Sequence, residues 1–210
     1  MKITQMKFQK IAVKGAFLFA AIAVFYSLIF ASQLYCFVPD VTCPEGDIGY
    51  ELYFAVQPFN KLLFTLTVSY LLVSILLLAF FCQSRRVYYV SNYVVTAVTA
   101  VLGVALSVYA LINVISYMTT FMSMDFVAIN EFLTKQNLRT ITPIPWSFLI
   151  GIIVFIGIIA FDVLMVINAL WKNKVMKKER EEYAEIDAEI YAKWEAQEKE
   201  LNKEADKYES

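Results

Sequence analysis

The sequence contains no histidine among its 210 residues. Histidine is the commonest general base near neutral pH and the commonest metal ligand in proteins. Its absence excludes serine–histidine and cysteine–histidine catalysis, together with every histidine-based metal site. A glycine-rich loop that could bind a phosphate group is also missing. We therefore expect a protein that is not an enzyme and that binds neither a metal nor a cofactor.

Charged residues are scarce as well: they make up 18% of the chain, while 60% of the residues are hydrophobic. A soluble domain has about a quarter charged residues. The charges are concentrated near the two ends, where the N-terminal segment is basic and the C-terminal segment is acidic. Neither end has the long basic, aromatic-interleaved pattern of a nucleic-acid-binding protein, so nucleic acid is not an expected partner. The composition favours a protein that lies in a lipid bilayer.

Four long apolar blocks account for the hydrophobic excess. They lie at about 11–34, 59–82, 87–117 and 146–171. Each exceeds the roughly 20 residues that a helix needs to cross a hydrocarbon core of about 30 Å. Barrel strands would instead be about ten residues long with strict alternation. The predicted fold class is thus an all-α integral membrane protein with a four-transmembrane-helix bundle and a C-terminal cytoplasmic amphipathic helix.

The remaining segments follow from these blocks. They are an N-terminal segment at 1–10, outer loops at 35–58 and 118–145, and a helical tail at 172–210. The first block follows a basic stretch, as a secretory signal does. It is longer than the roughly 7–15 apolar residues of a signal, and residues 31–33 form a poor cleavage site. We therefore interpret it as a retained helix.

Lysine and arginine near the helix ends predict the orientation, because these residues are enriched on the cytoplasmic side. Eleven of them fall on one side of a four-span arrangement and three on the other. The eleven are Lys2, Lys7, Lys10, Lys14, Arg85, Arg86, Lys172, Lys174, Lys177, Lys178 and Arg180, and the three are Lys61, Lys135 and Arg139. Both termini are predicted to be cytoplasmic. Short loops and the absence of an N-glycosylation sequon favour a bacterial inner (plasma) membrane.

The three cysteines fit this orientation. Cys36 and Cys43 lie in the first outer loop, whereas Cys82 lies at the inner end of the second block. Disulfides form in oxidising outer compartments, and Pro39-Asp40 between the two cysteines favours a turn that brings the sulfurs together. We predict a Cys36–Cys43 disulfide bond; the alternative is a pair of free thiols.

The second outer loop has a helical apolar pattern. Its apolar residues fall on one face of a helix at Phe121, Met122, Phe126, Ile129, Phe132 and Leu133. The pattern predicts a short helix that lies in the outer interface or caps the bundle. An extension of the third span past the membrane is the alternative.

The acidic tail predicts a helix that carries an apolar stripe. From Glu179 onward it has no glycine or proline, and its apolar residues recur at spacings near 3.6, with Gln197 filling one gap. They are Tyr183, Ile186, Ile190, Trp194, Leu201, Ala205 and Tyr208. An isolated helix of this length is marginal in water, so the stripe favours binding to a partner helix or self-association, as in a coiled coil. The spacing is too irregular for a regular heptad, and folding back under the bundle is the alternative.

One acidic residue, Asp162, falls inside the fourth block. A carboxylate near the bilayer centre is costly, so such a residue faces the bundle interior or a cavity. Depth matching from the cytoplasmic helix ends, at about 1.5 Å per residue, places it beside Ser74, Thr96 and Thr99. We expect Asp162 to be protonated, hydrated, hydrogen-bonded to hydroxyls or paired with a basic residue of another subunit. Tyr70 is interpreted as a packing residue.

Two functions remain. The first is a non-enzymatic membrane subunit or scaffold of a larger assembly, which docks other membrane protein subunits or a second copy through its tail helix and bundle surface. The second is a small homo-oligomeric channel or transporter that uses Asp162 as an intramembrane ion or proton site. A single intramembrane acid without broken helices is weak evidence for transport, so the subunit is the leading hypothesis.

Overall fold

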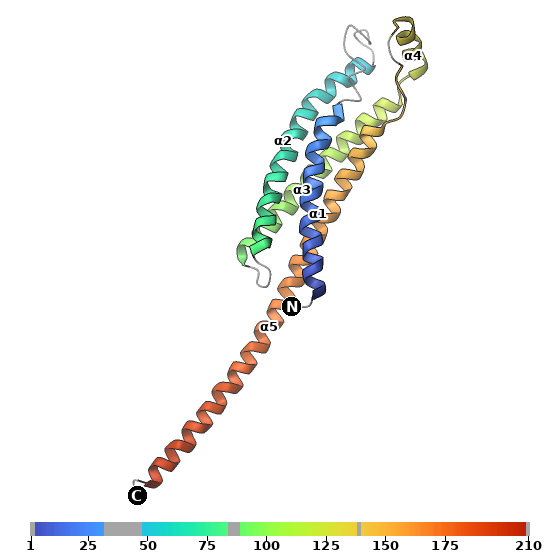
Figure 1. The fold of residues 1–210 in the computed structure, drawn as a ribbon. Coiled ribbons are helices and arrows are strands. Elements are labelled where there is room, and N and C mark those ends of the chain that lie inside the picture. The colour runs from blue at the N-terminus through green and yellow to red at the C-terminus, as the bar shows by residue number, and fades with distance from the viewer. Residues whose placement is uncertain (1–2, 32–47, 84–88, 138–139, 209–210) are drawn as a thin grey trace. The chain divides into compact units, whose positions relative to one another are not determined.

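The computed structural model describes residues 3–31, 48–83, 89–137 and 140–208. Within these ranges the protein is all-helical, with no strand. Its five helices are α1 (Ile3–Ile29), α2 (Ile48–Gln83), α3 (Val90–Met122), α4 (Phe126–Lys135) and α5 (Trp146–Tyr208). Four of them are long and apolar enough to cross a membrane. The multi-pass membrane protein predicted from the four apolar blocks is confirmed at this level (Figure 1).

Two helices are longer than the sequence blocks indicated. Helix α2 begins at Ile48 rather than near Phe59, so residues 48–58 of the predicted first loop are helical and Pro58 lies inside the helix. The helix continues because Leu52 and Val56 fall on its buried face. Helix α3 extends to Met122 rather than ending near residue 117. The cysteines of the predicted disulfide bond, Cys36 and Cys43, lie outside the described residues.

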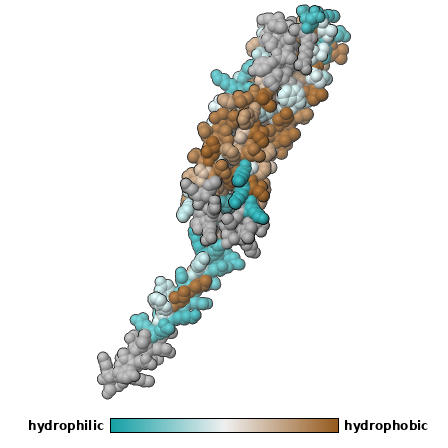
Figure 2. Space-filling model, in the orientation of Figure 1, coloured by the Kyte–Doolittle hydropathy of each residue, from teal (hydrophilic) through white to brown (hydrophobic). Residues whose placement is uncertain are grey.

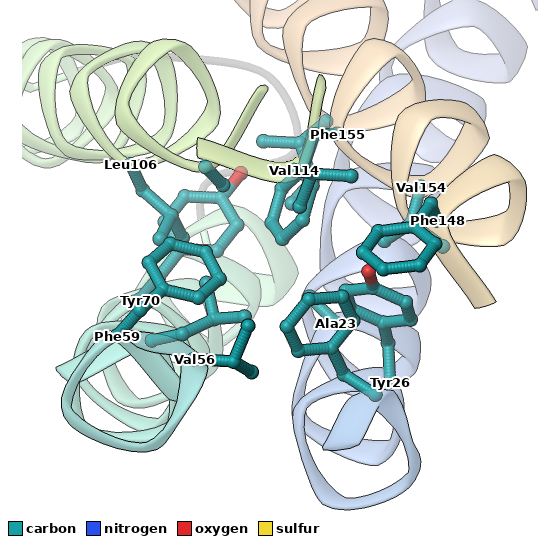
Figure 3. Close-up of a cluster of buried hydrophobic side chains, with 14 of the residues drawn as sticks. Ala23, Tyr26, Val56, Phe59, Tyr70, Leu106, Val114, Phe148, Val154 and Phe155 are labelled. Atoms are coloured by element: carbon teal, nitrogen blue, oxygen red, sulfur yellow. The ribbon is translucent and has the colours of Figure 1, made fainter. Parts of the chain in front are cut away.

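Helices α1, α2, α3 and the first part of α5, up to Ala169, form one compact unit, which we call the bundle. Its core is a cluster of buried apolar side chains drawn from all four helices. Figure 3 shows part of this cluster, with Tyr26 of α1 pointing toward α5 and Phe59 of α2 pointing into the interior. The rings of Phe30 and Phe148 pack edge to face with their centroids 5.5 Å apart, and those of Phe30 and Phe59 do so with their centroids 5.7 Å apart. Such pairs favour one relative placement of the helices over others.

Glycines allow α1 and α5 to approach closely. The ring of Phe19 on α1 occupies the space that a side chain at Gly157 would fill, and Tyr26 does the same at Gly151. In the opposite direction, Phe161 of α5 packs on Gly15 of α1. Between helices in lipid, close van der Waals packing on small residues replaces the hydrophobic driving force. These three contacts therefore stabilise the α1–α5 pair.

Helix α4 packs against the end of the bundle where α3 ends. Asp125 is the N-cap of α4: its Oδ1 accepts hydrogen bonds from the backbone N–H groups of Val127 and Ala128, each at 3.1 Å. Leu133 is buried, and Phe126 packs on Phe121 with ring centroids 5.0 Å apart. The predicted short helix in the second outer loop is confirmed, and the alternative is also correct in part, since α3 does extend beyond its predicted end.

Residues Leu170–Ser210 form a second compact unit, which contains the C-terminal part of α5. We call residues 172–208 the tail helix. Two exposed ion pairs at i,i+4 spacing lie near its start, Lys177–Glu181 at 3.9 Å and Lys178–Glu182 at 3.6 Å. Exposed pairs of this kind contribute only about 0.3–0.5 kcal/mol each. These two pairs therefore stabilise the helix only weakly.

Candidate functional site

Asp162 is buried in the bundle, with 1% of its surface exposed. The surrounding sequence of α5 is apolar and supplies a continuous helix, which fixes the direction of the carboxyl group. The depth of Asp162 within the bundle follows from the helix ends nearby. Two of its neighbours, Tyr70 and Gly103, each lie 13 residues from a helix end, at Gln83 and Val90. Thirteen residues correspond to about 20 Å of helix, so the carboxyl lies far from these helix ends, inside the bundle.

The hydroxyl of Tyr70 on α2 donates a hydrogen bond to Oδ1 of Asp162 at 2.8 Å. Both side chains are buried, and the two residues are 92 positions apart in the sequence. A hydrogen bond in a low-dielectric interior is stronger than in water, and leaving either partner alone would be costly. The bond therefore joins α2 to α5 near the middle of the bundle. Tyr70 was predicted to be a packing residue, and that interpretation missed its polar role.

Gly103 of α3 provides the space for the carboxyl group. A side chain at this position would overlap Oδ2 of Asp162 and the ring of Tyr70. Oδ2 itself is buried and has no hydrogen-bond partner among the residues that the structure describes. Tyr70, Gly103 and Asp162 thus form a three-helix contact, which we call the carboxyl site. One oxygen of this site is hydrogen-bonded and one is not.

The three hydroxyl residues predicted beside Asp162 are all buried, but they bond to their own helices. Ser74 donates to the carbonyl oxygen of Tyr70 at 2.9 Å. Thr96 and Thr99 donate to carbonyls four residues earlier, each at 2.7 Å. Bonds of this kind satisfy a hydroxyl in lipid without a second helix. None of the three donates a hydrogen bond to Asp162 within the described part of the chain, where the donor to its carboxyl group is the hydroxyl of Tyr70.

The described contact residues lie one helical turn from two of the predicted neighbours. Tyr70 precedes Ser74 by four residues on α2, and Gly103 follows Thr99 by four residues on α3. Both are about one turn, or about 5.4 Å of helix, further from the predicted cytoplasmic ends. The sequence signal that could have found Tyr70 is its position on the same face as Ser74, combined with the reach of its phenol side chain.

A shallow groove borders the carboxyl site on the surface between α2 and α3. It encloses about 160 Å³ and is lined by apolar residues of both helices together with Ser69 and Tyr70. Tyr70 therefore has one side toward this groove while its hydroxyl bonds to Asp162. In a bilayer, an acyl chain or a neighbouring helix would fill such a groove.

The tail helix contains the second predicted site. Four of the five predicted partner-binding residues are exposed by about half or more: Tyr183 (68%), Ile186 (51%), Ile190 (46%) and Trp194 (68%). The side chain of the fifth, Leu201, is outside the described part of the structure. Nearby Tyr191 is also exposed and widens the apolar surface. Figure 2 shows a brown apolar patch that interrupts the teal surface of the tail.

These two features differ in what they can do chemically. The carboxyl site can hold a proton or accept a further hydrogen bond at Oδ2, while the tail can bury aromatic and aliphatic side chains against a partner. A comparison with known protein families, curated proteins and solved structures finds none that matches this chain.

Proposed function

We propose that this protein is a non-enzymatic subunit or scaffold of a larger membrane assembly, anchored by its bundle and docked to a partner through its tail helix. The observation that carries the proposal is the exposed tail stripe, which we define as Tyr183, Ile186, Ile190 and Trp194. A contiguous exposed apolar surface on a helix is typical of an interaction site. Aromatic residues such as Tyr and Trp supply much of the binding energy at protein interfaces.

The magnitudes support binding to a partner over exposure to water. Full burial of a side chain of this size stabilises by about 1.5–3 kcal/mol relative to leaving it exposed. The four residues are 46–68% exposed, so a partner that covered them would gain several kcal/mol from this stripe. This gain offsets part of the cost of association, which is about 4–15 kcal/mol, and the apolar face of the partner would contribute further.

The proposed orientation places both termini in the cytoplasm of a bacterial inner membrane. Its support is the sequence asymmetry of eleven lysines and arginines against three. Four membrane crossings put the basic N-terminal segment and the basic start of the tail on the same side. The tail helix would then meet its partner in the cytoplasm, close to the membrane surface.

Gentle extraction of the tagged chain from its own membrane tests the proposal. We expect other membrane proteins to co-purify in a fixed ratio, identified by mass spectrometry, and to be lost when residues 183–210 are deleted. A sharper variant is Ile186→Asp with Ile190→Asp, which places two charges on the stripe. The matched control is Ala188→Asp with Ala192→Asp, which adds the same charges to exposed positions on the opposite face. Retention of the partners by the stripe variant would contradict the proposal.

The second candidate function is a small homo-oligomeric channel or transporter. Its support is the buried Oδ2 of Asp162, which lacks a hydrogen-bond partner among the described residues and lies deep in the bundle. Intramembrane carboxyls mark proton and ion pathways in pumps and transporters. The test is proton and cation flux in liposomes, for the wild-type chain and for Asp162→Asn. Glu131→Gln removes an exposed acid of α4 and serves as the control. Equal flux for Asp162→Asn and the wild type would exclude this candidate.

A further inference from the structure

Seven apolar residues of the tail, together with Gln197, follow an eleven-residue repeat. Counted from Tyr183, successive members are separated by three, four, four, three, four, four and three positions. The members are Tyr183, Ile186, Ile190, Trp194, Gln197, Leu201, Ala205 and Tyr208. All of them fall within the continuous helix α5, which extends to Tyr208. Eleven residues in three turns correspond to 3.67 residues per turn, so the residues stay on one face of a nearly straight helix.

This repeat explains why a heptad does not fit the tail. A heptad has 3.5 residues per turn and requires a left-handed supercoil, whereas an eleven-residue repeat favours a slightly right-handed one. The tail face thus suits a partner helix that runs alongside it with little winding. Gln197 falls in the repeat between Trp194 and Leu201. A single polar residue within an apolar seam fixes the register of two paired helices.

The positions beside the repeat are strongly acidic. Between residues 182 and 198, the positions directly before and after a repeat member hold six acids and one base. The acids are Glu182, Glu185, Asp187, Glu189, Glu195 and Glu198, and the base is Lys193. Residues 179–208 as a whole contain eleven acidic and five basic side chains, a net charge of −6. Flanking charges of this kind set partner choice in paired helices.

A second copy of the chain fits this pattern poorly. Two copies with the same orientation in one membrane would bring their tails together in parallel. Acidic flanks would then face acidic flanks, and like charges placed across an interface oppose pairing and suppress the wrong partner. An anionic lipid surface is disfavoured for the same reason, since basic rather than acidic segments bind it.

We infer that the occupant of the tail is a helix of a different protein, with apolar residues at eleven-residue spacing and lysine or arginine in its flanks. The inference rests on the proposed function and adds the chemistry of the partner. Basic flanks pair with the six acids, while the apolar face covers the tail stripe. Tyr183 and Trp194 occupy equivalent positions one repeat apart, and their rings accept cation–π contacts from lysine or arginine side chains at the edge of the partner helix.

The test uses a synthetic peptide as the probe and the full chain in nanodiscs of neutral lipid. The probe has the sequence of residues 179–208 with the six flanking acids replaced by lysine, which changes its net charge from −6 to +6. The comparison peptide has the native sequence of the same residues. We expect the basic probe to bind at least about tenfold more tightly than the native peptide, and to weaken about tenfold between low and high salt.

Variants of the full chain separate specific pairing from charge attraction. Ile186→Asp with Ile190→Asp makes the tail more acidic, so attraction by charge alone would strengthen binding of the basic probe. We expect this variant to lose binding, and the matched control Ala188→Asp with Ala192→Asp to retain it. Equal or tighter binding by the native peptide would overturn the inference in favour of a second copy. Failure of both peptides, or unchanged binding by the stripe variant, would also overturn it.

The outcome is distinguishable from failure of the proposed function. If partners co-purify in a way that depends on the stripe, and the basic probe does not bind, the partner chemistry is wrong while the subunit function stands. If nothing co-purifies from the native membrane, the subunit function itself fails, whatever the peptides do.

Discussion

The bundle and the tail helix each place one kind of side chain in an unfavourable environment, and the two cases are opposite. The bundle buries an acidic side chain, Asp162, in an apolar interior, whereas the tail exposes large apolar side chains on a charged helix. Residues of the chain itself accommodate the buried acid, because Tyr70 donates a hydrogen bond to it and Gly103 provides the space. The tail residues Tyr183 and Trp194 remain exposed. The difference supports the proposal that the tail, more than the bundle, binds a partner.

The same contrast holds for the forces involved. Within a membrane, helices gain little from burying apolar surface, so the bundle depends on close packing and on satisfied polar groups. Outside the membrane, burial of apolar surface is the main driving force for association. Substitutions in the bundle should therefore change the stability of the chain, and substitutions on the tail stripe should change only what it binds.

Gly103→Leu should have the largest effect on the isolated chain. The new side chain would overlap Asp162 and Tyr70, which cannot move without breaking their hydrogen bond. Overpacking costs about 1–3 kcal/mol, and a side chain as large as leucine at this position is expected to reach the upper end of that range. The free energy of unfolding in detergent, followed by tryptophan fluorescence, measures the effect. Val101→Leu, at an exposed position of the same helix, is the control. Equal stability of both variants would break the account of the carboxyl site.

Phe19→Ala should have the next largest effect. The variant removes the ring that packs on Gly157 and that lies 5.2 Å from Phe161, leaving a cavity between α1 and α5. We expect a loss of about 2 kcal/mol, below the range for soluble cores because lipid replaces the transfer term. Leu18→Ala, which changes an exposed neighbour, should cost under about 0.5 kcal/mol by the same unfolding assay. A larger loss from the control would contradict the assigned α1–α5 packing.

Tyr70→Phe should cost about 1–2 kcal/mol, since it leaves both oxygens of Asp162 without a donor. The same change in an Asp162→Ala background should cost close to nothing, because the hydroxyl then has no acceptor to serve. The four unfolding free energies form a double-mutant cycle that isolates this hydrogen bond. Additive effects of the two substitutions would show that the bond contributes nothing.

Substitutions on the tail stripe should have the smallest effect on stability. Ile186→Asp with Ile190→Asp changes two exposed side chains, so the free energy of unfolding should stay within about 0.5 kcal/mol of the wild type. The same holds for the control pair Ala188→Asp with Ala192→Asp. A clear loss of stability in the stripe variant alone would indicate that the stripe is covered by the chain itself, which would remove the difference between the bundle and the tail.

Length and apolarity alone predicted the four long helices, because in a bilayer these two properties decide whether a segment can span. Helix ends were harder to place. The apolar block suggested a start for α2 near Phe59, but Leu52 and Val56 continue the buried face before it and carry the helix back to Ile48. Tertiary packing thus extended the helix beyond the apolar block.

The carboxyl site was predicted only in part. Asp162 stood out as a lone acid in an apolar block, whereas Tyr70 is one of many tyrosines in the chain, and only its position on the same helix face as Ser74 distinguishes it in the sequence. The predicted α2 end near residue 82 agrees with the observed end at Gln83, yet the donor to Asp162 is Tyr70, one turn from the predicted Ser74. A helix end therefore locates a buried side chain only to about one turn.

The native mass of the complex shows whether the tail stripe holds a second protein. The tagged chain and its Ile186→Asp/Ile190→Asp variant would be extracted under the same mild conditions, and the mass of each complex would be measured with its components identified. The account predicts a larger complex with a second protein in fixed ratio for the wild type, and its loss in the variant. The same mass for both, corresponding to the chain alone, would contradict the account.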